Sequence, residues 1–240
     1  MENQERRSGI GMLIFILVLL IALLFIGWRY FRVSKIEVEG NVNIKADYIA
    51  MLTGIKTDQN LFAINTDKVK TYINSDPYLE YYALKRIYPS TVRVEVYERI
   101  PAALLIGKNK NYVLDNQGNV LEAIDQMDYT LMRITGLEGF TAIPGQSLST
   151  QTPYQYDALT AILKDVEYNT LSKMVMTMDI SDINQITMRT NIGFTVMFGQ
   201  AEKVSDKIIW IEKAIEELAK SNITTGTINV VSGDSAAYSK

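Results

Sequence analysis

The chain lacks the two side chains on which much enzyme chemistry depends, since none of its 240 residues is histidine or cysteine. Histidine is the commonest general acid or base, thiolates are strong nucleophiles, and the two together supply most zinc ligands. Serine–lysine peptidases and two-carboxylate glycosidases need neither residue. A hydrolase of one of these kinds therefore stays open as an alternative function.

The motifs that such hydrolases require are not recognisable. No serine lies in a Gly-x-Ser-x-Gly or Ser-x-x-Lys sequence. Asp179 and Asp182 lie in D-I-S-D-I-N, which is typical of a turn between strands. The run from Asp115 to Asn119 has calcium-loop composition, but it lacks the acidic residue that an EF-hand places after its glycine. We expect a hairpin turn there, no catalytic residue, no metal site, no cofactor and no enzymatic activity.

Two further observations narrow the possible ligands. Met174, Met176 and Met178 alternate along a predicted strand, so we expect them to pack in the core rather than to bind a soft metal. The 24 Lys and Arg residues are outnumbered by 27 Asp and Glu residues, for a formal net charge of −3. Nucleic acid is bound through clustered cations, so we expect no nucleic-acid partner.

A membrane anchor is predicted near the amino end. Ser8 to Trp28 contains no charged residue, and a helix of this length spans the hydrocarbon core of a bilayer, about 30 Å thick. The bulky residues that follow, Trp28 to Arg32, do not suit signal-peptide cleavage. We therefore predict residues 10–28 as an uncleaved transmembrane helix, with residues 1–9 as a short tail before it. Cations flank both ends of the helix, so charge alone leaves its orientation open.

Residues 33–101 show the pattern of a strand, two helices and two strands. Ile36 and Val38 alternate with charged residues, and Val92, Val94 and Val96 share one face of a later strand. Asn43 is predicted to cap the first helix, and Asn65 or Thr66 the second. This β-α-α-β-β order is the order of a POTRA (polypeptide-transport-associated) domain.

Residues 102–240 are predicted to form a second, mixed α/β domain, so the fold class is α+β behind a single transmembrane helix. The pattern indicates a hairpin around Asp115–Asn119, a helix after Thr152, and a helix from Val204. The expected strands are 131–136, 174–178, 185–190, 194–198 and 226–231.

The last of these strands, Gly226–Val231, is predicted to be an edge strand that a partner chain extends. The alternative is an ordinary core strand. On the edge interpretation the partner-binding residues are Thr227, Ile228, Asn229, Val230, Val231 and Tyr238. A second contact surface is predicted on the polar face of the POTRA hairpin, at Arg93, Glu95 and Tyr97.

Two sequence stretches resemble the FtsQ/DivIB family of bacterial division proteins. The first is I-E-V-E-G-N behind a single anchor, and the second is R-I-Y-P-S-T-V-R-V-E-V-Y-E-R-I-P from Arg86 to Pro101. The resemblance extends from residue 10 to 238. The family often carries Asp and Arg in its last strand, where this chain has Asn229 and Val231.

The resemblance implies a scaffold that links early and late division proteins at the septum. Its implied partners are FtsL-like and FtsB/DivIC-like membrane proteins, bound through the C-terminal domain, with a septal wall synthase as a further candidate. It also implies a single-pass protein of the cell membrane, with a cytoplasmic amino end and the bulk of the chain outside. The competing functions are a membrane-anchored cell-wall or peptide hydrolase and a sensor with a ligand pocket.

Overall fold

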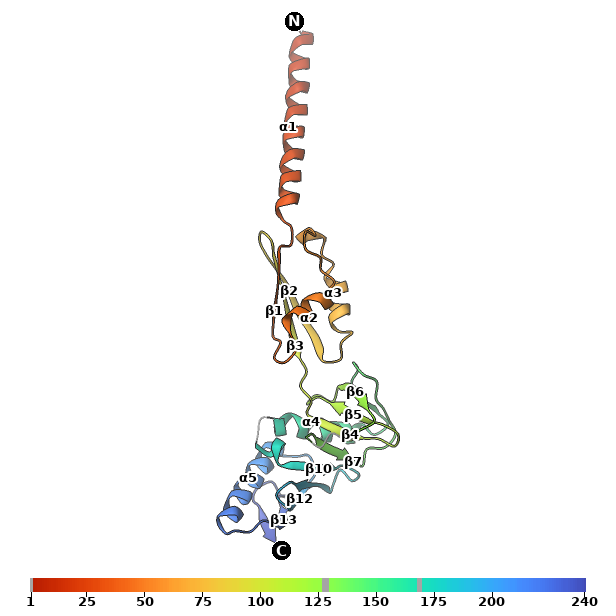
Figure 1. The fold of residues 1–240 in the computed structure, drawn as a ribbon, viewed down its shortest axis with the longest axis vertical. Coiled ribbons are helices and arrows are strands. Elements are labelled where there is room, and N and C mark those ends of the chain that lie inside the picture. The colour runs from red at the N-terminus through yellow and green to blue at the C-terminus, as the bar shows by residue number, and fades with distance from the viewer. Residues whose placement is uncertain (1, 127–129, 168–169) are drawn as a thin grey trace. The chain divides into compact units, whose positions relative to one another are not determined.

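The computed structural model describes residues 2–126, 130–167 and 170–240. Packing divides the chain into two compact units, Met1–Glu98 and Arg99–Lys240. Each unit has its own hydrophobic core, and Figure 1 shows the elements of both.

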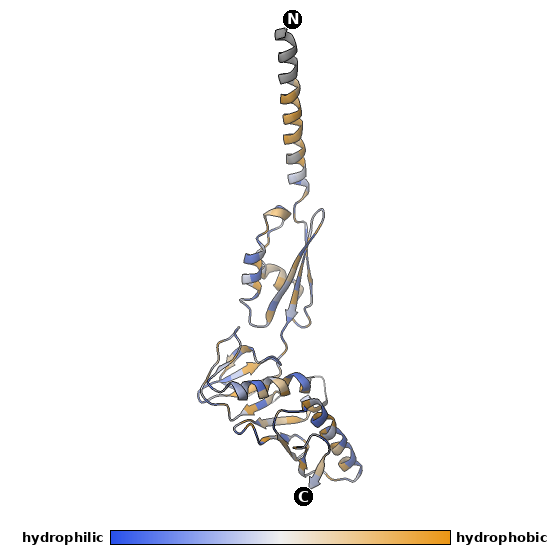
Figure 2. Ribbon diagram, turned by 180° about the vertical axis from the view of Figure 1, so that it is seen from behind, coloured by the Kyte–Doolittle hydropathy of each residue, from blue (hydrophilic) through white to orange (hydrophobic). Residues whose placement is uncertain are grey.

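The first unit begins with helix α1, Glu2–Tyr30. Its segment Met12–Tyr30 has a mean hydropathy of 2.7, and none of that segment is buried in the structure. Figure 2 shows hydrophobic residues along much of its length. A 19-residue helix rises about 28 Å at 1.5 Å per residue, close to the thickness of the hydrocarbon core. Among the described residues, α1 is the one helix long and apolar enough to anchor the chain in a membrane.

The remainder of the first unit has the predicted β-α-α-β-β order, with one short 3₁₀ helix added. Its elements are β1 (Lys35–Glu39), α2 (Ala46–Leu52), η1 (Leu61–Ala63), α3 (Thr66–Ile73), β2 (Leu79–Ile87) and β3 (Thr91–Glu98). The sheet order is β1-β3-β2, with β1 parallel and β2 antiparallel to the central β3. Val92, Val94 and Val96 face the core with residues of both helices, as their alternation predicted. The POTRA architecture is confirmed.

A buried carboxylate shapes the loop between β1 and α2. The Glu98 side chain accepts hydrogen bonds from the backbone N–H groups of Val42, Asn43 and Ile44 at 2.6–3.0 Å. The prediction that Asn43 caps α2 is wrong, because the helix starts only at Ala46 and its N-cap residue is Lys45, which makes no side-chain cap hydrogen bond. The second helix does begin as predicted, since the Asn65 side chain accepts a hydrogen bond from the Lys68 N–H at 3.0 Å.

The second unit is one large sheet covered on one face by two helices. Its strands are β4 (Ala103–Ile106), β5 (Asn111–Leu114), β6 (Val120–Ile124), β7 (Met132–Thr135), β8 (Phe140–Thr141), β9 (Ser149–Thr150), β10 (Val175–Asp179), β11 (Ile186–Thr190), β12 (Phe194–Gly199), β13 (Gly226–Asn229) and β14 (Ala237–Ser239). Its helices are α4 (Pro153–Glu167), η2 (Thr170–Lys173) and α5 (Val204–Lys220). The apolar faces of α4 and α5 pack on the sheet through residues such as Leu159, Ile162, Ile208 and Ile211.

The strand order of this sheet is β14-β13-β12-β11-β10-β7-β4-β5-β6, with β8 and β9 paired separately. The strand predicted at 226–231 is therefore not at the edge. β13 lies between β12, to which it is parallel, and β14, to which it is antiparallel. After Val230 the chain reverses through a turn in which the Gly233 N–H bonds to the Val230 carbonyl at 2.9 Å. Ala237–Ser239 then returns along β13 and becomes the edge strand.

The prediction that Met176 packs in the core is also wrong. Met178 is fully buried and Met174 is partly buried against the core, but Met176 is 42% exposed. The register of β10 against β11 shifts between Val175 and Thr177, so a bulge breaks the alternation on which the prediction relied.

Candidate partner-binding surface

β14 is an edge strand of the large sheet in the second unit, at the opposite end from β6. Its three residues pair with β13 as Thr227↔Ser239, Ile228↔Tyr238 and Asn229↔Ala237. Within the described residues no strand pairs with its other side. A strand in this position presents backbone N–H and C=O groups to another chain.

Two lysines at the start of α5, the N-cap residue Lys203 and Lys207, lie next to the turn that leads to β14. Lys203 forms an exposed ion pair with Asp234 at 2.7 Å. Lys207 is 2% exposed, and its Nζ donates hydrogen bonds to the Phe198 carbonyl at 3.0 Å and the Gln200 carbonyl at 2.7 Å. Its aliphatic chain also lies near Gly233, since a Cβ there would be 3.6 Å from the Lys207 Cε. Burial lowers the pKa of Lys207 below its ordinary value, and the two carbonyl acceptors and the Phe198 ring, 4.9 Å away, compensate the cation.

The six residues predicted to bind a partner do not share one surface in the structure. Ile228 and Val230 are fully buried against the helices, so neither side chain can contact another protein. Thr227 and Asn229 lie on the opposite face of the sheet, where Val231 is 48% exposed. The half-buried Tyr238 packs on the core, and its hydroxyl donates to the Thr225 carbonyl at 2.9 Å. Strand β14 also contains Ala237 and Ser239, which the sequence interpretation omitted.

Arg93, Glu95 and Tyr97 lie on the face of the POTRA sheet opposite its core, where a charge network occupies them. Arg93 contacts Glu37 through Nη2 at 3.0 Å and Glu39 through Nη1 at 3.0 Å. Glu95 pairs with Lys85 at 2.5 Å. Hydrogen bonds from Lys35 and Arg93 lower the pKa of Glu37. The hydrogen bond with Glu37 in turn raises the pKa of Arg93. Tyr97 is 45% exposed next to this network.

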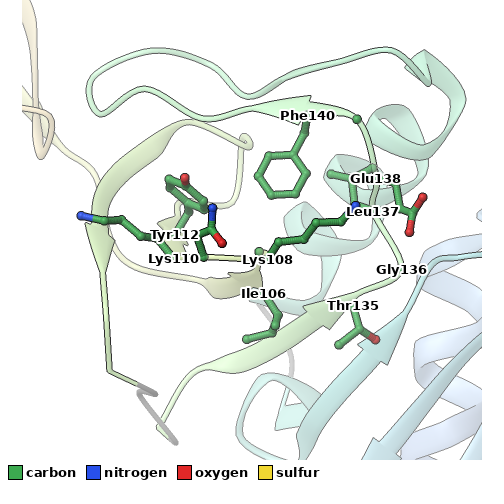
Figure 3. A pocket seen from close by; sticks show the side chains of 12 residues that line it. Ile106, Lys108, Lys110, Tyr112, Thr135, Gly136, Leu137, Glu138 and Phe140 are labelled. Carbon is green, nitrogen blue, oxygen red and sulfur yellow. The ribbon is translucent and has the colours of Figure 1, made fainter.

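A pocket of 480 Å³ lies between the β4–β5 turn and the loop after β7. Figure 3 shows Lys108, Tyr112 and Phe140 around it. The rings of Tyr112 and Phe140 lie edge to face, with their centroids 5.8 Å apart. Among the described residues that line this pocket, Glu138 is the one carboxylate. Both hydrolysis geometries of a two-carboxylate glycosidase need a second acid, which these described lining residues do not include.

The other residues with possible chemistry have structural roles. The Asp179 and Asp182 carboxylates accept backbone N–H groups two residues ahead, each at 2.9 Å, as turn residues do. Asp115 does the same for Gln117 at 2.9 Å and Asn119 at 2.8 Å. In the described part of the chain, no three His, Cys, Asp or Glu side chains are grouped so that they could hold a metal ion.

Two family models match the chain, one over each unit. The model for the FtsQ-type POTRA domain matches residues 31–99. The model for the C-terminal part of the cell division protein FtsQ/DivIB matches residues 103–231. β14 lies beyond the second match, so its position as the edge strand comes from the structure.

Similar proteins carry the same family names. The cell division protein DivIB of Clostridium tetani is 24% identical over 180 residues, 75% of this chain and 68% of that protein. The cell division protein FtsQ of Syntrophotalea carbinolica is 27% identical over 194 residues, 79% of this chain and 67% of that protein. The major extracytoplasmic domain of DivIB from Geobacillus stearothermophilus superposes with a TM-score of 0.37 at 11% identity, covering 51% of this chain and 96% of that one. The chain belongs to the FtsQ/DivIB family of cell division proteins.

Proposed function

We propose that this protein is a non-enzymatic scaffold of the bacterial division machinery, which links early and late division proteins at the septum. Helix α1 anchors it in the cell membrane, with the amino end cytoplasmic and both folded units outside. The second unit binds FtsL-like and FtsB/DivIC-like membrane proteins. The polar face around Arg93, Glu95 and Tyr97 offers a further contact surface, for which a septal wall synthase is the candidate.

The open edge of β14 is the observation that carries this proposal. A partner strand added there gains main-chain hydrogen bonds, and the side chains beside it decide which strand fits. Ala237 and Ser239 are small and exposed, so they leave the approach to the edge free. The strand is only three residues long and Lys240 follows it, two features that limit unspecific pairing between sheet edges.

A proline scan of residues 237–239 tests the edge. Proline removes one backbone donor, and alternate N–H groups of an edge strand point toward β13 or toward the partner. We expect at least one of the three variants to keep the melting temperature of the protein while it loses binding to the FtsB/DivIC-like partner from the same organism. Calorimetry with and without the partner measures both quantities.

Thr227→Pro is the matched control, because it places proline in the interior strand β13. We expect this variant to lose the fold of the second unit rather than binding alone. If every variant at 237–239 that folds also binds like the wild type, the partner does not extend β14.

Orientation is tested separately with a reporter that is active only outside the cytoplasm, fused after Lys240. We expect activity from this fusion. Activity only from a cytoplasmic reporter at the same position would exclude the scaffold function, because both folded units would then lie inside the cell.

A further inference from the structure

Four aromatic side chains are in contact where α1 joins the POTRA unit. Tyr30 packs edge to face on Phe31 at 5.6 Å, and Phe31 does the same on Phe62 at 5.3 Å and on Tyr88 at 5.6 Å. Phe62 and Tyr88 are 5.8 Å apart, which closes the group. We call these four residues the aromatic tip. Despite their mutual contacts, Tyr30 is 65%, Phe62 54% and Tyr88 58% exposed.

Hydrogen bonds fix the aromatic tip to the end of α1. The Leu61 N–H donates to the Phe31 carbonyl at 2.9 Å, and the Asn60 side chain donates to the Trp28 carbonyl at 2.8 Å. On the other side, Arg86 donates from Nε to the Leu61 carbonyl at 3.0 Å. The loop that carries Phe62 is therefore held both by the helix end and by β2, and no free linker separates α1 from the POTRA fold.

The position of the tip along the chain places it at the depth of the lipid headgroups. Arg29 is the first charged residue after the apolar run, so the hydrocarbon core ends near it. Tyr30 and Phe31 follow at once, and Phe62 and Tyr88 touch Phe31. Aromatic rings favour this interfacial layer, where the ring leaves water and a tyrosine hydroxyl stays hydrated.

The charges beside the tip also suit a lipid surface. Arg29 and Arg32 flank the first two rings, and cations near a bilayer interact favourably with lipid phosphates. Lys56 lies in the loop before η1, together with the acidic Asp58. Three cations, Arg29, Arg32 and Lys56, therefore accompany one acid, Asp58, in a protein whose overall charge is negative.

We propose that the aromatic tip inserts into the interfacial layer of the bilayer that α1 spans, so that Phe62 and Tyr88 of the POTRA fold contact lipid. This proposal rests on membrane anchorage by α1. It adds that the POTRA fold itself is a membrane-contacting element.

Single-tryptophan variants of the full chain, reconstituted into phosphatidylcholine vesicles with brominated acyl chains, test the proposal. The chain has two tryptophans, Trp28 and Trp210. Trp210→Phe alone leaves Trp28 as the reporter of α1. Adding Trp28→Phe and then Phe62→Trp or Tyr88→Trp reports on the tip at two independent positions, and circular dichroism verifies that each variant is folded.

Tyr82→Trp in the same background is the matched control. Tyr82 is 76% exposed on β2, and the five residue steps from it to Ile87 place it roughly 17 Å along the strand from the tip. We expect bromine to quench most of the emission of the Trp28 reporter and of the variants at 62 and 88, with blue-shifted spectra. The variant at 82 keeps its emission and is quenched by aqueous acrylamide instead.

The outcomes distinguish failure of the proposed tip insertion from failure of membrane anchorage by α1. If the Trp28 reporter is quenched by bromine while the variants at 62 and 88 behave like the variant at 82, α1 is inserted and the proposal is overturned. The exposed rings would then be a surface for a protein. If the Trp28 reporter is not quenched either, α1 does not span the bilayer, and both the anchorage and the proposal fail.

Discussion

Glu98 shows how one side chain can determine the path of a distant loop. Its carboxylate is 5% exposed and binds three consecutive backbone N–H groups, at residues 42–44. Burial raises its pKa, but the backbone hydrogen bonds outweigh burial, and the pKa is lower than its ordinary value of 4.5. The alternation of β3 placed Glu98 on the same face as the valines, yet it could not reveal partners more than fifty residues away.

We expect Glu98→Gln to destabilise the POTRA unit by about 2 kcal/mol at neutral pH, the typical contribution of hydrogen bonds to a charged group. Because the pKa is lowered in the folded state, this stabilisation is present above 4.5 and is lost as the pH falls through the folded value. Urea unfolding should therefore show a difference in the free energy of unfolding between the wild type and Glu98→Gln that becomes smaller as the pH is lowered. Glu122→Gln, at an exposed position, is the control. A difference that does not change with pH would contradict the assignment to the carboxylate.

Lys207 and Lys203, the N-cap residue of α5, allow a matched comparison at the start of one helix. Lys207→Met keeps the aliphatic shape but removes the donor to the buried Phe198 carbonyl and to the Gln200 carbonyl, and we expect a cost of about 1–3 kcal/mol. Lys203→Met removes only an exposed ion pair to Asp234, so we expect a smaller cost than that of Lys207→Met. Thermal unfolding of the two variants measures the difference. Equal costs would mean that the buried lysine does not hold the end of β12.

At the scale of elements, the sequence predicted most of what local periodicity encodes. The valine alternation in β3 and the apolar spacing in α5 gave the correct element types, and Asn65 gave the correct helix start. β14 was missed because three residues are too few to show alternation. The edge was therefore assigned to β13, whose pattern is clear but whose position inside the sheet depends on a later segment.

Strand β1 gives a prediction at the same scale, because Val33, which precedes the strand, also contributes to the core of the POTRA unit. Val33 is 1% exposed in the POTRA core, and its N–H and carbonyl bond to the loop at residues 58–59. A fragment that starts at Ile36 lacks Val33, whereas one that starts at Phe31 keeps it. We expect the shorter fragment, 36–240, to be soluble and folded but less stable than 31–240 by about 1.5–3 kcal/mol, the burial free energy of one such side chain. Equal stability by urea unfolding would show that β1 is sufficient by itself.

At the scale of the whole molecule, the division between the two units falls at a single peptide bond. Glu98 binds the loop of the POTRA unit. Arg99 belongs to the second unit, where its Nε lies 3.7 Å from the Asp115 carboxylate. The boundary predicted at 101/102 would leave Arg99 on the POTRA side. We propose instead that the second unit is complete only when it begins at Arg99, since Asp115 is 2% exposed and a buried carboxylate needs its cation.

Two fragments of the second unit test this boundary. We expect fragment 102–240 to be less stable than fragment 99–240 by about 1–3 kcal/mol, because truncation leaves Asp115 buried with only its turn hydrogen bonds. Asp115→Asn in both fragments separates this charge effect from the loss of three residues. If the ion pair is the cause, truncation costs less in the Asn background, since the charge that needs Arg99 is gone. A truncation cost that is the same in both backgrounds would place the boundary effect in Ile100 and Pro101 and not in the contact between Arg99 and Asp115.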